Sequence, residues 1–97
     1  MNKMRPIHPI EILREEFLVP LGLLASALAL ELKVPAPRIN DIVRERRAVT
    51  PDTALRLSRY FGTSPEFWMD LQTAFDLKTA AKDSDGKIEA EISPRAA

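Results

Sequence analysis

Four arginines and one asparagine lie close together in the middle of the chain. Arginine pairs well with the edge of guanine and asparagine with the edge of adenine, whereas basic side chains beside the groove usually bind phosphate. We predict that Arg38 and Asn40 read base edges in double-stranded DNA. Phosphate contacts are predicted for Arg44, Arg46 and Arg47. The alternative is an ordinary solvated helix face followed by an exposed loop.

Asp41 lies among these basic residues and repels phosphate. It is therefore either an acceptor for a cytosine amino group or a partner that holds Arg38 or Arg44 in place. The net charge of the chain is zero, but residues 33–47 carry five cations against two anions. A basic stripe on an otherwise acidic small domain is typical of a DNA-binding surface, although a solvated charged face can give a similar excess.

The apolar spacing predicts how these residues are presented. Between Leu28 and Ile42, apolar residues recur one helical turn apart in two pairs, with a single valine between the pairs. Two short helices joined by a tight turn would bury these positions and hold the second helix on the surface. This is the helix-turn-helix arrangement, whose second helix can enter the major groove. We place the two helices at about 24–32 and 36–44.

Start and stop residues predict three further helices, so the expected fold is all-α with five helices. The first begins at Pro9 and ends near Gly22. The fourth and fifth begin at Thr50 and Ser64, each of which is followed by a proline and an acid. The fifth helix is expected to fade near Ala81.

The fifth predicted helix has more large apolar side chains than so small a core needs. Trp68, Leu71 and Phe75 lie on its apolar face. At helical spacing, such residues form a core or a dimer interface far more often than a platform for stacking bases. We therefore predict that these three residues contribute to the interface of a homodimer. Leu24 and Leu30 are either isolated surface leucines or a patch for a partner.

The helices define one DNA-binding domain at residues 1–82, and the character of the chain changes at residues 83–97. The stretch KDSDGK is polar and rich in turn formers, and Lys87 to Ile92 alternates charged and apolar residues. This pattern predicts either a short C-terminal strand or a disordered tail, because one isolated strand is not stable alone.

Other functional classes find little support in the sequence. The chain has no cysteine and a single histidine, His8, which we interpret as a polar residue beside a helix start. It also lacks a glycine-rich phosphate loop and a nucleophile elbow, so we expect no enzyme activity, metal or cofactor. No apolar run approaches the roughly 20 residues of a membrane span, and the N-terminus lacks a signal peptide. A cytoplasmic protein without membrane contact is therefore expected.

Three segments resemble the HigA (VapI-type) antitoxins: MRPIHPIEILREEFLVPLGL, RINDIV and LRLSRYFGTSPEFWMDLQTAFDL. These antitoxins belong to the XRE group of lambda-repressor-like helix-turn-helix proteins. The resemblance covers residues 4–80, and the stretch TSPEFWMDLQ separates this subfamily from generic phage repressors. It implies a small all-α homodimer that binds an operator in its own promoter. It also implies binding to a RelE-like toxin that cleaves mRNA on the ribosome.

The chain departs from the family pattern at several positions. Leu24-Ala25 stands where Ser-Gln is usual, which removes a helix cap and a phosphate contact. Lys33 replaces the turn glycine and is therefore expected to adopt a positive φ. Glu45 replaces the glycine expected in the loop after the recognition helix.

Together these features predict an antitoxin that represses its own operon and neutralises a RelE-like toxin. Two alternatives stay open: a stand-alone XRE-type repressor, and a helix-turn-helix scaffold used only for protein binding. DNA binding at physiological salt separates the scaffold from the other two. A short basic RelE-like reading frame beside the gene would separate the antitoxin from the repressor.

Overall fold

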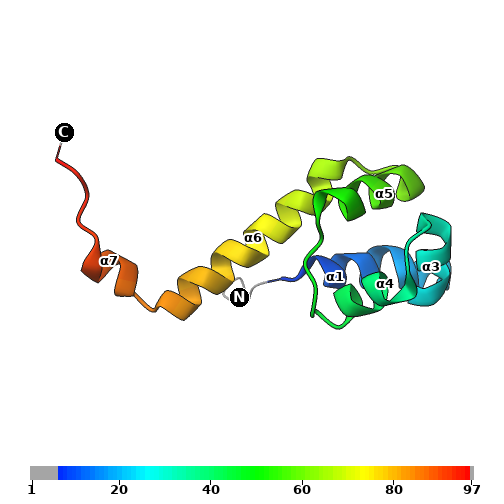
Figure 1. Cartoon of the computed structure of the whole chain (residues 1–97), viewed down its shortest axis with the longest axis horizontal. Helices are drawn as coiled ribbons and strands as arrows, with labels where there is room; N and C mark the ends of the chain where they lie inside the picture. The colour runs from blue at the N-terminus through cyan, green and yellow to red at the C-terminus, as the bar shows by residue number, and fades with distance from the viewer. Residues whose placement is uncertain (1–6, 97) are drawn as a thin grey trace.

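The computed structural model describes residues 7–96, and within this range the chain folds into helices and their connections without a strand. The predicted all-α fold is thus confirmed. A compact body holds most of the helices, and α6 extends from it toward α7 (Figure 1). The elements are α1 Pro9–Ile12, the π-helix η2 Leu13–Leu18, α2 Val19–Leu21, α3 Ala25–Leu32, α4 Ala36–Val43, α5 Pro51–Phe61, α6 Pro65–Ser84 and α7 Lys87–Glu91.

The elements α1, η2 and α2 form one continuous helical stretch with a π turn in its middle. Nδ1 of His8 caps its start by accepting a hydrogen bond of 3.0 Å from the backbone N–H of Ile10. Within η2 the bonds reach one residue further than in an α-helix, and the N–H of Val19 accordingly donates to the carbonyl of Arg14. Gly22 ends the stretch with a φ of 63°.

The helices α3 and α4 pack against each other and form the predicted helix-turn-helix. Leu28 and Leu32 of α3 are buried, as are Ile39 and Ile42 of α4. The turn between them depends on Lys33, whose φ of 63° lies in the left-handed region. The positive φ expected for this residue is confirmed, and it strains a residue that carries a Cβ.

The helices α5 and α6 begin at the predicted caps. Oγ1 of Thr50 accepts a hydrogen bond from the N–H of Thr53 at 3.4 Å, and Oγ of Ser64 accepts one from the N–H of Phe67 at 3.1 Å. The longest helix is α6, with 20 residues. Within residues 7–96, no helix is both long and apolar enough to cross a bilayer.

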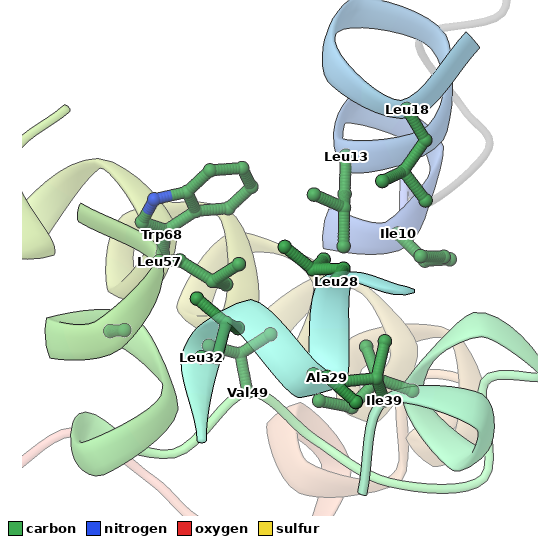
Figure 2. Close-up of a cluster of buried hydrophobic side chains, with 12 residues drawn as sticks. Ile10, Leu13, Leu18, Leu28, Ala29, Leu32, Ile39, Val49, Leu57 and Trp68 are labelled. Carbon is green, nitrogen blue, oxygen red and sulfur yellow. The ribbon is translucent and has the colours of Figure 1, made fainter. Parts of the chain in front are cut away.

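The core lies where the first helical stretch, α3, α4, α5 and the first half of α6 meet (Figure 2). Trp68 of α6 is fully buried there, and its Nε1 donates a hydrogen bond of 2.7 Å to Oγ1 of Thr63. The rings of Phe17 and Phe61 pack against the indole with centroids 5.3 and 6.5 Å away. The apolar body of the tryptophan thus fills the core while its one polar group is satisfied.

A buried glutamine ties the loop before α5 to α6. Oε1 of Gln72 accepts a hydrogen bond of 2.8 Å from the backbone N–H of Val49, and its Nε2 donates to Asp76 at 3.0 Å. Both Gln72 and Val49 are buried. This contact fixes the loop that follows α4, because an unpaired buried N–H would be costly.

Of the two alternatives for residues 87–92, the strand is wrong, because residues 87–91 form α7 and Ile92 follows as its C-cap. The backbone of an isolated strand has no neighbour to pair with, whereas a helix satisfies its groups locally. The N–H of Ala90 donates to the carbonyl of Gly86, and that of Ile92 to the carbonyl of Ile88. Alanine, glutamate and lysine also favour helices.

The helix α6 extends beyond its predicted end at Ala81 and finishes at Ser84. The predicted domain boundary between residues 82 and 83 therefore falls inside a helix, and it stays a prediction. Residues 1–6 and 97 of the two predicted regions lie outside the described range. We call residues 7–76 the helical body and residues 77–96 the C-terminal arm.

Candidate nucleic-acid interface

The helix α4 presents a polar face above two buried isoleucines, Ile39 and Ile42. The residues predicted to contact DNA all lie on this face or in the loop after it. Those on α4 are partly buried, and those after it are exposed. The partly buried group is Arg38, Asn40 and Asp41, and the exposed group is Arg44, Arg46 and Arg47.

Arg38 is held by a carboxylate from the next helix. Its Nη1 donates to Oδ2 of Asp52 at 2.6 Å. The same oxygen accepts a hydrogen bond of 2.9 Å from Nε of Arg56. Nη1 of Arg56 in turn donates to the carbonyl of Leu32, the last residue of α3, at 2.8 Å. These hydrogen bonds connect α3, α4 and α5, and we call Arg38, Asp52 and Arg56 the arginine clamp.

The arginine clamp also affects the charge state of its carboxylate. The guanidinium groups of Arg56 and Arg38 both donate to Asp52, and they hold the pKa of its carboxyl below the usual range. Asp52 is therefore ionised at neutral pH. One negative charge lies between two positive ones, so the arginine clamp as a whole carries a net charge of +1.

Asp52 and Arg56 are absent from the residues that the sequence predicts for this surface. Their i,i+4 spacing on α5 indicates only a pair within one helix. The approach of Arg38, 14 positions earlier in the chain, depends on the tertiary packing of α4 near the start of α5. No local pattern in the sequence contains that information.

Asp41 contacts a different arginine from the two predicted. Its Oδ2 lies 3.8 Å from Nη2 of Arg47, so the alternative that paired it with Arg38 or Arg44 is wrong. The reason lies in the backbone after α4. Glu45 has a φ of 58°, which turns the chain back, and the N–H of Arg46 donates to the carbonyl of Asp41 at 2.7 Å. This turn keeps the last two arginines beside α4.

The structure corrects the prediction for Trp68. Its side chain is 0% exposed within a single chain, so it has no surface to offer a second copy. Leu71 and Phe75 are partly buried, and the ring of Phe75 meets that of His8 edge-on with centroids 4.7 Å apart. A dimer interface that contains Leu71 and Phe75 stays a prediction.

Leu24 and Leu30 are both well exposed, at 71% and 74% of their surface. Leu24 is the N-cap of α3 and, as expected for the loss of serine, makes no side-chain capping bond. It also lines a groove of about 360 Å³ together with Val19, Leu23 and Val43. This apolar groove lies between the end of the first helical stretch and α4.

Known proteins resemble the chain over most of its length. The helix-turn-helix family model matches residues 13–68. Virulence-associated protein I of Dichelobacter nodosus is 60% identical over 82 residues, which cover 84% of this chain and 76% of that protein. Antitoxin HigA-1 of Vibrio cholerae is 35% identical over 76 residues, which cover 78% of this chain and 71% of that protein. The structure of Pseudomonas aeruginosa antitoxin HigA with the higBA promoter has a TM-score of 0.91 and 53% identity, covering 95% of this chain and 100% of that chain.

Proposed function

The chain belongs to the HigA (VapI-type) family of helix-turn-helix antitoxins, and from this premise we propose that it represses its own operon and neutralises a RelE-like toxin. The surface of α4 and of the loop after it carries the proposal for DNA, because Arg38 and Asn40 lie on the helix and three further arginines follow it, while the apolar face of the helix is buried. The similar HigA antitoxin from Pseudomonas aeruginosa was solved with a promoter, which supports the same role. The proposed mechanism is binding rather than catalysis. We also propose a cytoplasmic location, because the target is operator DNA.

In this mechanism α4 enters the major groove. Arg38 is the third and Asn40 the fifth of its eight residues, and side chains toward the N-terminal end of a recognition helix reach base edges. Arg44, Arg46 and Arg47 follow the helix and bind phosphates, which fixes the orientation of the domain without reading sequence.

A homodimer would bring two such helices onto one operator. Two copies related by a two-fold axis place their recognition helices about 34 Å apart, one turn of DNA, so the operator is an inverted repeat. Phe67, Leu71 and Phe75 lie one helical turn apart on α6 and are only partly covered. This face of α6 is the dimer interface that we propose.

Titration of DNA against two single variants tests the DNA-binding role. On the promoter of its own operon, Arg38→Ala costs about 1–3 kcal/mol and relaxes the preference at one base position. Arg46→Ala weakens binding to promoter and scrambled duplexes equally and lowers the salt slope by about one unit. Arg95→Ala, which removes an exposed arginine from the C-terminal arm, is the matched control and leaves both affinities unchanged. Equal losses on both duplexes for Arg38→Ala would remove its base-reading role.

The antitoxin role is tested separately from the DNA role. A short basic RelE-like reading frame beside the gene, whose product co-purifies with this chain and loses its mRNA cleavage in the complex, is the expected result. A chain that binds its promoter but captures no such product would be a stand-alone repressor. A chain that captures the product but binds no DNA would be a protein-binding scaffold.

A further inference from the structure

The arginine clamp places an acidic residue beside an arginine that we propose to contact DNA. Asp52 approaches Arg38 to 2.6 Å, and Arg38 is one of the two residues of α4 for which we propose base contacts. A carboxylate near the DNA surface repels phosphate, so its presence weakens binding to every DNA sequence. Its position therefore calls for a benefit other than general affinity.

We propose that Asp52 is a specificity-determining residue, which fixes the guanidinium of Arg38 for base reading and keeps it from general phosphate contacts. This inference rests on the proposed DNA-binding function and adds to it. A guanidinium has five N–H donors, and Nη1 of Arg38 gives one to Asp52. The other edge of the planar group can then meet guanine, whose two acceptors match such a fork.

The far side of the arginine clamp gives this arrangement rigidity. Asp52 is itself held by Arg56, and Arg56 is held by the carbonyl of Leu32 at the end of α3. The carboxylate is thus fixed against two helices of the body before DNA arrives. A side chain that is ordered in advance loses less conformational freedom when it binds a base.

The groove beside the arginine clamp is rich in positive charge, which Asp52 partly neutralises. The groove has a volume of about 570 Å³, and its walls include three cations, Lys33, Arg56 and Arg59. Its acids are Glu31 and Asp52. Without Asp52, Glu31 would be the one acid left in the lining of the groove against three cations, and Arg38 would lose its carboxylate partner, so the surface would become more basic. Such a surface binds the phosphate backbone of any sequence.

A second acid in the same local context provides a matched control. Thr50-Pro51-Asp52 opens α5 and Ser64-Pro65-Glu66 opens α6, so each acid lies in the first turn behind a capping hydroxyl and a proline. Both acids are exposed. Asp52 joins two arginines, whereas Glu66 makes no ion pair with any residue in the range 7–96. Helix capping and the helix dipole therefore explain an acid at this position, but they do not explain its pairing with two arginines.

The test measures binding of four variants to a duplex that covers the promoter of its own operon and to a scrambled duplex of the same composition. The expected result for Asp52→Asn is tighter binding to scrambled DNA and a salt slope larger by about one unit. The ratio of promoter affinity to scrambled affinity should fall about fivefold or more, the equivalent of losing one base contact. Glu66→Gln removes the same charge and leaves this ratio unchanged.

The remaining variants show whether Asp52 acts through Arg38. In the background Arg38→Ala, the change Asp52→Asn should leave the affinity ratio unaltered. A ratio that still falls in this background would overturn the inference, and so would a parallel change on both duplexes, which a purely structural clamp would give. Thermal unfolding of each variant, followed by circular dichroism, confirms that the folded protein is compared. If the wild-type chain shows no promoter preference at all, the proposed function fails, and the inference fails with it.

Discussion

The helix α6 passes from one environment into another along its length. In the helical body it packs against α5 and α1 and buries Trp68 and Gln72. In the C-terminal arm it continues away from the body, and Leu77, Ile88 and Ile92 are exposed by 66%, 54% and 65% (Figure 1). The body is therefore helical because its helices bury shared faces, whereas the arm is helical through local hydrogen bonds and side-chain propensity. Helices of the second kind are marginal on their own.

The largest expected effect compares one residue from each region. Trp68→Ala should lower the free energy of unfolding by about 3–5 kcal/mol, because it leaves a cavity in the core. Leu77→Ala in the arm should change it by less than about 0.5 kcal/mol, since the leucine is exposed and alanine favours helix. Urea unfolding followed by circular dichroism measures both. A loss above about 1 kcal/mol for Leu77→Ala would show that the arm packs against a partner.

A smaller effect is expected at the link between the loop after α4 and α6. Gln72→Ala should cost about 1–3 kcal/mol, because it leaves the buried N–H of Val49 without a partner. Thr73→Ala, the exposed neighbour on α6, is the control and should be nearly silent. The same urea experiment applies. Equal effects at the two positions would mean that the loop does not depend on this hydrogen bond.

The cap of the first helical stretch should make the stability of the body sensitive to pH. Burial lowers the pKa of His8, although the carboxylates of Glu45, Asp76 and Glu11 oppose the shift. The unfolded chain therefore binds a proton more readily. The contribution of His8 to stability is present above the ordinary value of 6.5 and is lost as the pH falls below it toward the lowered folded value.

Protonation of Nδ1 would also remove the acceptor for the N–H of Ile10, and a lost cap costs about 1 kcal/mol. His8→Asn keeps a capping oxygen but does not titrate, so it should flatten this part of the profile. The free energy of unfolding at about pH 7.5 and about pH 5.5, on either side of the ordinary pKa, measures the difference. Identical profiles for the wild type and His8→Asn would rule out this role of His8.

The smallest effect on the fold is expected from the arm itself. Deletion of residues 84–97 removes α7, and it should leave the unfolding of the body and the DNA contacts of each α4 intact. Ile88 and Ile92 lie one turn apart and are exposed beside Glu89 and Glu91, which suits a basic toxin surface. Toxin affinity, measured by calorimetry, or the dimer dissociation constant should therefore weaken. If neither changes, the arm has no part in assembly.

The sequence predicts most of the body because its local rules and its packing agree. The apolar spacing from Leu28 to Ile42 defines the helix-turn-helix, and Thr50 and Ser64 cap the helices that they were expected to cap. In the arm the two do not agree, because an alternation of charged and apolar residues over six positions favours a strand only where a second strand can pair with it. No second strand lies beside this segment within residues 7–96, so its local helix propensity decides the outcome.

The candidate site is less predictable than the fold for a related reason. Residue types and spacing indicate which side chains belong to the surface of α4 and its loop. They do not indicate that Arg38 meets Asp52 or that Asp41 meets Arg47, since these pairs depend on how helices pack and how one loop turns. They also do not show that the side chain of Trp68 is fully buried in the core of its own chain.

The π turn in the first helical stretch suggests where a homologue could be one residue shorter than this chain. Leu13 and Leu18 are both buried although they are five positions apart, because the π turn holds one residue more than an α turn would. Removing the exposed Glu16 would leave the two leucines four apart, which is the spacing of one face of an ordinary α-helix. We therefore expect a single-residue gap to be tolerated here, so that homologues one residue shorter in this stretch align with the chain on both sides of it without displacing the core.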